Sequence, residues 1–301
     1  MVKLVECVPN FSEGQRKEVI DAIVDEARKY NVKILNVTPD ASHNRTDVTI
    51  IGEPEEVKKA AMDMAVKAVE LIDMNKHKGE HPRMGAMDVV PFVPLMNMSM
   101  EECIQLAHEF AKEFSEKTGV PCFLYEEAAT RPDRKNLADV RRGEFEGLKE
   151  EIGKNPEKTP DYGPNAIHPT AGATAVGARE FLIAFNVNLA TDDISIAKNI
   201  AKAVRHSSGG YRYVKAMGFE IKEKGIVQVS MNMTNYRKTP LFRVFETIKS
   251  EAARYGVNVL SSEIVGMIPL EAMVDICKFY LQLDDFKMEQ VIEKRMLEEM
   301  L

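Results

Sequence analysis

The chain of 301 residues has no tryptophan, only four cysteines and no long hydrophobic run. Its longest apolar stretches, Met87–Leu95 and Phe181–Val187, fall well short of the ~20 residues that a membrane helix needs. No two cysteines form a C-x-x-C pair, which argues against a disulfide scaffold and a zinc ribbon. Lys3 and Glu6 interrupt the apolar N-terminus, so no signal peptide is expected. These absences predict a reduced, cytoplasmic protein that does not enter a membrane.

Basic residues are in the minority, since 40 lysines and arginines face 47 acidic residues and the formal net charge is −7. This balance argues against a nucleic-acid-binding protein. The basic stretch Arg131–Arg142 contains no aromatics and is diluted by Asp133 and Asp139. It is either a solvated charged face or a segment that steers a polyanionic small ligand. The 45% of hydrophobic residues is typical of a globular protein.

Hydrophobic periodicity predicts alternating strands and helices in the first half of the chain. Strands are expected at Val2–Val8, Lys33–Val37, Asp47–Ile51, Met87–Leu95 and Pro121–Tyr125, and helices at Arg16–Tyr30, Pro54–Met74 and Met100–Lys117, the last capped by Ser99. The charged segment Glu126–Pro160 has little periodicity, and we expect a linker with short helical turns there.

The second half predicts a β-α-β-β-α-β order, which is that of a ferredoxin-like unit with one antiparallel sheet. Its elements are expected at Phe181–Asn188, Asp192–His206, Arg212–Ile221, Ile226–Asn232, Leu241–Tyr255 and Val257–Ile264, followed by helices at Pro269–Leu283 and Asp285–Leu301. Asp21–Leu35 also aligns with Glu246–Leu260, which indicates two similar halves with a ligand crevice between them.

The densest chemistry lies in Asn75–Asp88, which contains the zinc-protease pattern H-x-x-E-H from His77 to His81. Two histidines four residues apart chelate one metal from a single helix face, but Gly79 and Pro82 break such a helix. We therefore expect no metal here.

His81 is a candidate general base, because Pro82 stiffens the backbone after it and Arg83 places a cation beside it. The alternative is a solvated loop whose histidines only cap neighbouring groups, and this is the expected role of His77. Farther along, Gly172–Arg179 half-matches a phosphate-binding loop but lacks its lysine. Its small residues indicate close approach of a flat ligand or tight packing.

Five motifs together resemble the formiminotransferase family. They are VECVPNFSEG at Val5–Gly14, the loop His43–Thr46, LIDMNKHKGEHPRMGAMDVVPF at Leu71–Phe92, YEEAATRP at Tyr125–Pro132, and GATAVGAR followed by FLIAFNVNL. The resemblance implies an α+β protein of two tandem ferredoxin-like subdomains, here 1–178 and 179–301, with folate between them, and a homodimer. It also implies transfer of the formimino group from N-formimino-L-glutamate to N5 of tetrahydrofolate, which yields 5-formiminotetrahydrofolate and L-glutamate in histidine degradation.

The resemblance further implies that His81 is the catalytic residue. The implied folate-binding segment comprises Gly163, Pro164, Asn165, Ala166, Ile167, His168, Pro169, Thr170, Ala171 and Gly172. Arg45, Arg83 and Lys78 are candidate partners for substrate carboxylates. A role for Asp40 stays open, and a fused cyclodeaminase domain is not expected. Two alternatives remain, a transferase that uses N-formylglutamate and a non-catalytic folate-binding protein.

Overall fold

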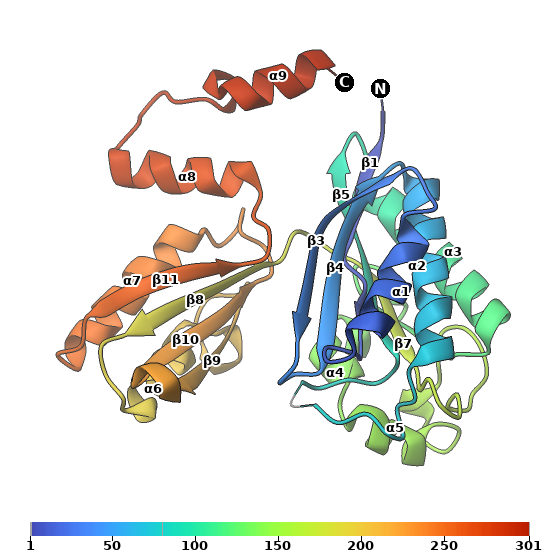
Figure 1. Cartoon of the computed structure of the whole chain (residues 1–301). Helices are drawn as coiled ribbons and strands as arrows, with labels where there is room; N and C mark the ends of the chain where they lie inside the picture. Colours follow the sequence, from blue (N-terminus) through green and yellow to red (C-terminus); the bar gives the residue numbers. More distant parts are fainter. Residues whose placement is uncertain (1, 80, 301) are drawn as a thin grey trace. The chain divides into compact units, whose positions relative to one another are not determined.

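The computed structural model describes residues 2–79 and 81–300 and divides the chain into two compact units, Met1–Arg179 and Glu180–Leu301 (Figure 1). Each unit has its own sheet and its own hydrophobic core. We call them unit 1 and unit 2 and describe each by itself.

Unit 1 begins with a β-α-β-β-α-β segment. Its elements are β1 (Leu4–Cys7) and β2 (Asn10–Phe11), which together form the first strand, α1 (Lys17–Ala27), β3 (Val32–Asp40), β4 (Arg45–Gly52), α2 (Pro54–Leu71) and β5 (Met87–Met96). The strands are antiparallel neighbours in the order β3, β4, β1 with β2, and β5. This is the strand order of a ferredoxin-like unit, so the expectation of such a half is confirmed.

Three further elements widen the sheet of unit 1. They are α3 (Met100–Thr118), β6 (Cys122–Glu126) and β7 (Thr174–Ala178). Strand β7 lies parallel to and between β5 and β6. The predicted cap of α3 is confirmed, because the Ser99 hydroxyl accepts a hydrogen bond from the Glu102 amide and Glu102 reciprocates. Strand β7 was not predicted, and its Gly177 packs closely against the ring of Tyr125, since a Cβ there would lie 2.6 Å from that ring.

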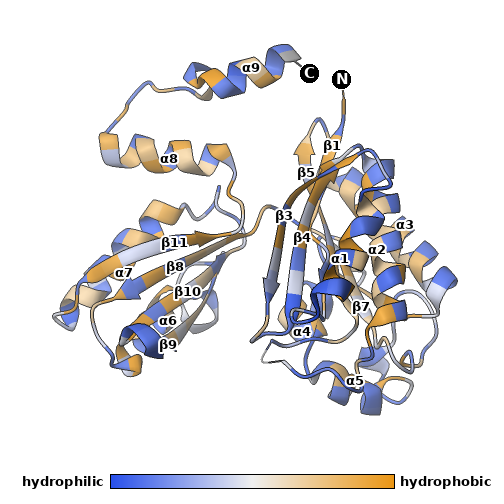
Figure 2. Cartoon of the chain, in the orientation of Figure 1, coloured by the Kyte–Doolittle hydropathy of each residue, from blue (hydrophilic) through white to orange (hydrophobic). Residues whose placement is uncertain are grey.

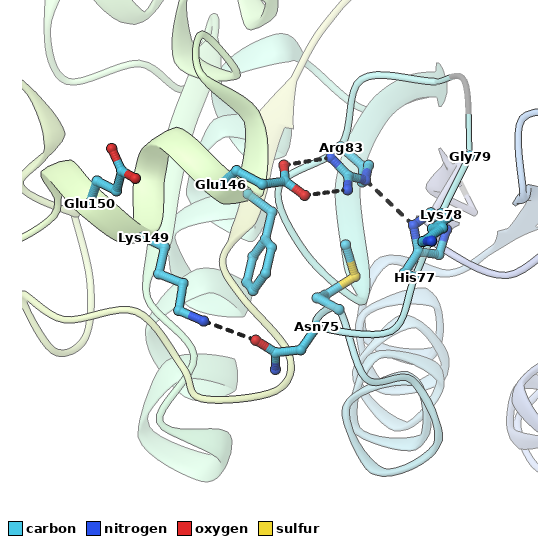
Figure 3. A pocket seen from close by; sticks show the side chains of 10 residues that line it. Asn75, His77, Lys78, Gly79, Arg83, Glu146, Lys149 and Glu150 are labelled. Carbon is cyan, nitrogen blue, oxygen red and sulfur yellow. Dashed lines mark hydrogen bonds and ion pairs between the residues drawn. The ribbon is translucent and has the colours of Figure 1, made fainter.

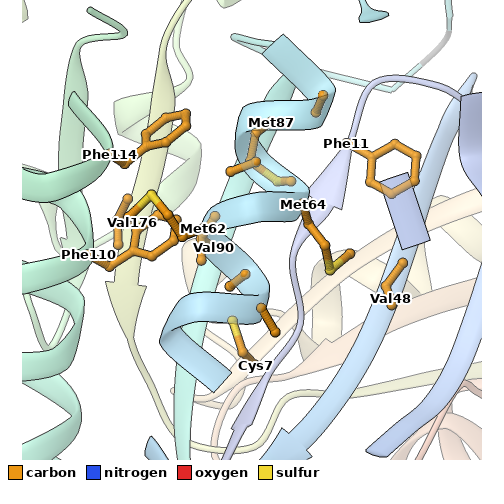
Figure 4. Close-up of a cluster of buried hydrophobic side chains, with 14 of the residues drawn as sticks. Cys7, Phe11, Val48, Met62, Met64, Met87, Val90, Phe110, Phe114 and Val176 are labelled. Atoms are coloured by element: carbon orange, nitrogen blue, oxygen red, sulfur yellow. The ribbon is translucent and has the colours of Figure 1, made fainter. Parts of the chain in front are cut away.

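The main core of unit 1 lies between the sheet and helices α1, α2 and α3 (Figure 4). Met64 of α2 and Met87 of β5 are fully buried in this core, as are Phe110 and Phe114 of α3. Burying each such side chain contributes about 1.5–3 kcal/mol. The methionines of this core therefore fill space between helix and sheet.

Glu126–Pro160 contains the expected short helical turns, but the prediction that it is a linker is wrong. This segment belongs to unit 1 and contains α4 (Leu137–Val140), α5 (Glu144–Glu151) and two short 3-10 turns. Val140 and Leu148 are buried against Val89 of β5 and Phe123 of β6. Because successive residues of a strand face opposite sides, this second core lies on the face away from α1, α2 and α3. The apolar residues of the segment were hidden among its charges.

Unit 2 has the β-α-β-β-α-β order that its sequence predicts. Its elements are β8 (Ile183–Leu189), α6 (Ile194–Val204), β9 (Val214–Ile221), β10 (Ile226–Met233), α7 (Leu241–Arg254) and β11 (Val259–Val265). All neighbouring strands are antiparallel, in the order β11-β8-β10-β9. The prediction of a single antiparallel sheet is confirmed.

Two helices follow this sheet, α8 (Leu270–Leu281) and α9 (Ile292–Met300), so the expected closing helices are present. Figure 2 shows that both carry apolar and polar residues along their length. Within residues 2–79 and 81–300, no helix is both long enough and apolar enough to span a bilayer.

Candidate functional site

Three loops of unit 1 meet where the N-terminal end of β5 begins. They are the turn after β2, the turn between β3 and β4, and the histidine loop, which we define as Asp73–Ala86 apart from Glu80. Glu80, part of the H-x-x-E-H pattern, lies outside the described residues. Asn44 holds the loops together, because its side-chain oxygen accepts from the Gly14 amide at 2.9 Å and its amide group donates to the Lys78 carbonyl at 2.8 Å. Asn44 has a left-handed backbone with φ of 48°, which asparagine tolerates better than most residues.

Asp88 is the centre of this site. Its side chain is completely buried at the start of β5, and it accepts a hydrogen bond from the Met84 amide at 2.8 Å. It also accepts hydrogen bonds from Arg45 of β4 and from Arg141, which follows α4. Burial alone raises the pKa of Asp88, but Arg141 and Arg45 outweigh it, and the pKa lies below its ordinary value. Asp88 is therefore ionised, and one carboxylate is shared by two guanidinium groups.

Arg45 connects Asp88 to the residues around it. Its Nε and Nη2 both donate to the side-chain oxygen of Asn10, at 3.0 and 2.7 Å. Its Nη1 donates to Asp88 and lies 3.3 Å from Nδ1 of His81. Each side of the Arg45 guanidinium is thus occupied, so its orientation is fixed.

His81 combines a fixed imidazole with a vacant nitrogen. Its Nδ1 lies 2.6 Å from the Pro82 carbonyl, which places the ring hydrogen on Nδ1. Within the described part of the chain, Nε2 has no hydrogen-bond partner, so its lone pair is available. Burial, with the charges of Arg45 and Arg141, lowers the pKa of His81 to about 4. The imidazole is therefore neutral at pH 7, as a general base must be.

His77 occupies the same loop but has both ring nitrogens engaged. Its Nε2 donates to the Asn44 carbonyl at 2.8 Å, and its Nδ1 accepts from Nε of Arg83 at 3.4 Å. Burial lowers its pKa as well. Through these contacts His77 joins two loops, and neither of its ring nitrogens is free to bind a substrate.

The other predicted carboxylate partners lie around a pocket of about 690 Å³ (Figure 3). Arg83 donates to Glu144 at 2.7 Å and to both oxygens of Glu146, so much of its guanidinium is already used. Lys78 has no ion pair within residues 2–79 and 81–300. The pocket is lined by Met74, Asn75, His77, Lys78, Gly79, Arg83, Phe145, Glu146, Lys149 and Glu150.

The segment Gly163–Gly172 packs against the histidine loop through backbone hydrogen bonds. The Met74 amide donates to the Thr170 carbonyl at 2.7 Å, and the Ala86 amide donates to the Ala171 carbonyl at 2.8 Å. Gly172 has φ of +73°, and a Cβ there would lie 2.3 Å from the Met84 carbonyl. The structure thus places the C-terminal part of this segment beside the loop that carries His81.

Three residues of the site were not predicted from the sequence: Asn10, Asp88 and Arg141. Asp88 carried a signal, since it is a lone charge at the start of an otherwise apolar strand. Arg141 lay within a stretch for which a solvated face was one of two interpretations. Asp40 pairs with the exposed His43, whose ring is 6.0 Å from that of His81. Within residues 2–79 and 81–300, no three His, Cys, Asp or Glu side chains are grouped as metal ligands.

Comparisons with known proteins cover both units. Residues 4–179 match the Formiminotransferase domain, N-terminal subdomain, and residues 184–299 match the Formiminotransferase domain. The chain is 51% identical over 299 residues to the glutamate formimidoyltransferase of Streptococcus pyogenes serotype M1, which covers 99% of this chain and 100% of that protein. The glutamate formimidoyltransferase of Thermoplasma acidophilum is 48% identical over 298 residues, 98% of each chain. The formimidoyltransferase-cyclodeaminase of Gallus gallus is 46% identical over 288 residues, 94% of this chain and 53% of that protein.

Proposed function

Because this chain belongs to the formiminotransferase family, we propose that it is a glutamate formimidoyltransferase. It transfers the formimino group of N-formimino-L-glutamate to N5 of tetrahydrofolate, in histidine degradation. The products are 5-formiminotetrahydrofolate and L-glutamate. The observation that carries this conclusion is the 51% identity to a glutamate formimidoyltransferase over nearly the whole of both chains.

The reaction moves one proton between two nitrogens. N5 of tetrahydrofolate attacks the formimino carbon, which forms a C–N bond and a tetrahedral adduct with positive charge on N5. A base removes the N5 proton, and an acid delivers a proton to the glutamate nitrogen as the C–N bond to glutamate breaks. One imidazole can serve both steps. We assign this role to Nε2 of His81, because the imidazole is neutral, Nε2 is vacant, and the Pro82 carbonyl holds the ring through Nδ1.

Asp88, Arg45 and Asn10 influence His81 through a chain of hydrogen bonds and charge, with Arg45 next to the imidazole. Asp88 fixes Arg45, and Arg45 lies 3.3 Å from His81. The positive charge of Arg45 disfavours the imidazolium form, so His81 returns the proton readily once it has taken it. These three residues position the imidazole and do not need to touch the substrates.

The segment Gly163–Gly172 is the proposed site for the folate co-substrate. Its contacts with Met74 and Ala86 keep it beside the histidine loop. Of the three candidate carboxylate partners, Lys78 is the most accessible, because Arg45 and Arg83 already pair with Asp88 and Glu146. We assign Lys78 to a substrate carboxylate at the pocket of Figure 3. No metal takes part in the reaction as proposed.

The resemblance of the chain to its family also supports a cytoplasmic homodimer. Sedimentation of the purified protein at a range of concentrations tests the dimer, and fractionation of the source cells tests the location. A mass of one chain at assay concentration would contradict the dimer, and recovery outside the cytoplasm would contradict the location.

The activity is tested by incubating the protein with N-formiminoglutamate and tetrahydrofolate and measuring L-glutamate release. Release that needs both substrates, with a folate product of the mass of 5-formiminotetrahydrofolate, is the expected result. Replacing the donor by N-formylglutamate tests the related transferase, and equal or faster release would favour it. Folate binding without release from either donor would instead indicate a non-catalytic folate-binding protein.

A further inference from the structure

Arg141 is the cation of the site with the most unused hydrogen-bond donors. A guanidinium carries five N–H groups. Arg45 uses three of its nitrogens on Asn10 and Asp88, and Arg83 uses three on His77, Glu144 and Glu146. Within residues 2–79 and 81–300, the side chain of Arg141 donates only through Nη2, to Asp88.

The Nε of Arg141 is buried without any hydrogen-bond partner in the described part of the chain. Such a group is costly, because a buried donor that has lost water and found no acceptor destabilises the protein. The whole side chain is 12% exposed. Nε itself is closed to solvent, but Nη1 also has no partner in the described residues and is not fully buried, so an acceptor from outside the protein can reach the guanidinium through Nη1.

The net charge around Arg141 indicates which charge the acceptor group carries. Asp88 carries one negative charge, and Arg45 and Arg141 carry two positive charges between them. His43, whose ring is 6.0 Å from that of His81, pairs with Asp40, and the carboxyl group of Asp47 acts on Arg45. The three charged groups that act on His81 are Arg45, Arg141 and Asp88, and together they carry an excess of one positive charge. This excess favours an anion, and a carboxylate matches the planar fork of a guanidinium.

The chemistry of the reaction identifies which carboxylate comes close to His81. The leaving nitrogen of N-formiminoglutamate is bonded to Cα, and Cα carries the α-carboxylate. Any group that protonates this nitrogen therefore has the α-carboxylate nearby. The glutamate tail of folate is separated from N5 by the whole p-aminobenzoyl group, so it lies much farther from the reacting atoms.

We propose that Arg141 binds the α-carboxylate of the formimino donor beside His81. This assignment rests on the proposed transferase function. The incoming carboxylate completes the hydrogen bonds of Arg141 and offsets the surplus positive charge. It thereby makes the imidazolium of His81 less unfavourable at the moment when His81 accepts the N5 proton.

The test compares Arg141→Gln with Arg142→Gln. Arg142 is the adjacent arginine, is 78% exposed and pairs with Asp139, so it supplies a matched control. We expect Arg141→Gln to lower kcat/KM for N-formiminoglutamate about ten- to a hundredfold, the range for a hydrogen bond to a charged group, with little change in KM for tetrahydrofolate. Arg142→Gln should stay close to the wild type.

Donor analogues show which carboxylate Arg141 binds. Converting the α-carboxylate to a carboxamide should lower kcat/KM of the wild type by the same factor as the Arg141→Gln substitution does. The same change of donor should lower kcat/KM of Arg141→Gln little further. Converting the γ-carboxylate to a carboxamide should lower kcat/KM of both proteins by the same factor. Equal α-carboxamide penalties in both proteins would overturn the proposal. A second result would also overturn it. If Arg141→Gln raised KM for tetrahydrofolate but not for tetrahydropteroate, which lacks the glutamate tail, Arg141 would bind the tail of folate instead.

A binding measurement keeps this test separate from the activity. L-glutamate retains the α-carboxylate, and calorimetry should show that it binds the wild type and Arg142→Gln more tightly than Arg141→Gln. Arg141→Lys keeps the charge but loses the fork and should fall in between; circular dichroism checks that each variant folds. Equal glutamate affinity in folded wild type and Arg141→Gln would refute the role of Arg141. Absence of turnover in the wild type would refute only the proposed function.

Discussion

Replacing His81 by glutamine tests the central chemical assignment. Glutamine can still donate a hydrogen bond to the Pro82 carbonyl, which is 2.6 Å from Nδ1 of His81, but it has no basic nitrogen. Loss of general acid–base catalysis typically costs about 10²–10⁴-fold in rate. We expect a fall of kcat in this range, because essentially all of the wild-type His81 is neutral and active at pH 7. Folate affinity should change much less.

The pH dependence of kcat/KM gives a second quantitative test of the role of His81. With a pKa of about 4, His81 is roughly 90% neutral at pH 5, whereas a histidine with the ordinary pKa of about 6.5 is only about 3% neutral there. The wild type should therefore keep most of its plateau kcat/KM at pH 5, some 30-fold more than an ordinary histidine allows. The rate should decline only as pH falls toward 4, where the imidazole becomes charged.

The assay is glutamate release over about pH 4.5 to 8, a range that contains the ordinary histidine pKa of about 6.5 and stays above 4, for the wild type, His81→Gln and His77→Gln. His77 is the control, because its ring nitrogens contact Asn44 and Arg83 instead of substrate. We expect a modest loss for His77→Gln and an unchanged pH profile. A folded His81→Gln protein with near-wild-type kcat would remove His81 from the mechanism. An acid limb near pH 6.5 in the wild type would show that burial and the two arginines do not disfavour the imidazolium.

Three further predictions concern packing, ligand contact and a helix cap. Gly85→Ala places a Cβ 2.0 Å from the Ala173 carbonyl and should lower the free energy of unfolding by about 1–3 kcal/mol in urea titrations, whereas Gly147→Ala, with open space around it in α5, should raise it by up to about 1 kcal/mol. Tetrahydrofolate should slow hydrogen exchange in Gly163–Gly172, and protection confined to other segments would exclude this segment from the folate site. Ser99→Ala should cost about 0.5–2 kcal/mol in thermal unfolding, and an unchanged stability would show that the cap hydrogen bond contributes nothing.

Local patterns predict the elements of this protein well where apolar residues recur with a clear period. Unit 2 was predicted element by element, because helices such as α6 and strands such as β10 each show one apolar face. Strand β7 was missed because the residues of Thr174–Ala178 are small, and all five are buried without polar alternation. Short helical turns were predicted for Glu126–Pro160, but the packing of α4 and α5 on the sheet was missed because few apolar residues lie among many charges.

The residues of the candidate site also differ in how far the local sequence predicts them. His81 could be found from its own neighbours, since Pro82 and Arg83 follow it directly. Arg141 could not, because only the packing of α4 and α5 on the sheet brings it to Asp88. Arg83 has contacts that its neighbours in the sequence could not predict. A cation next to the histidine suggested a substrate contact, but α5 supplies Glu144 and Glu146 to it.

The ion cluster around Asp88 has a consequence for how unit 1 folds. Asp88 is 43 residues from Arg45 and 53 residues from Arg141, so both pairs close long loops, whose entropy cost precedes any gain from contact. A carboxylate buried with too few cationic partners is strongly destabilising. An intermediate with β5 in place but α4 undocked would hold Asp88 with one arginine missing. The cluster therefore penalises half-assembled forms of unit 1, and catalytic competence should appear only with the last, cooperative step of its folding.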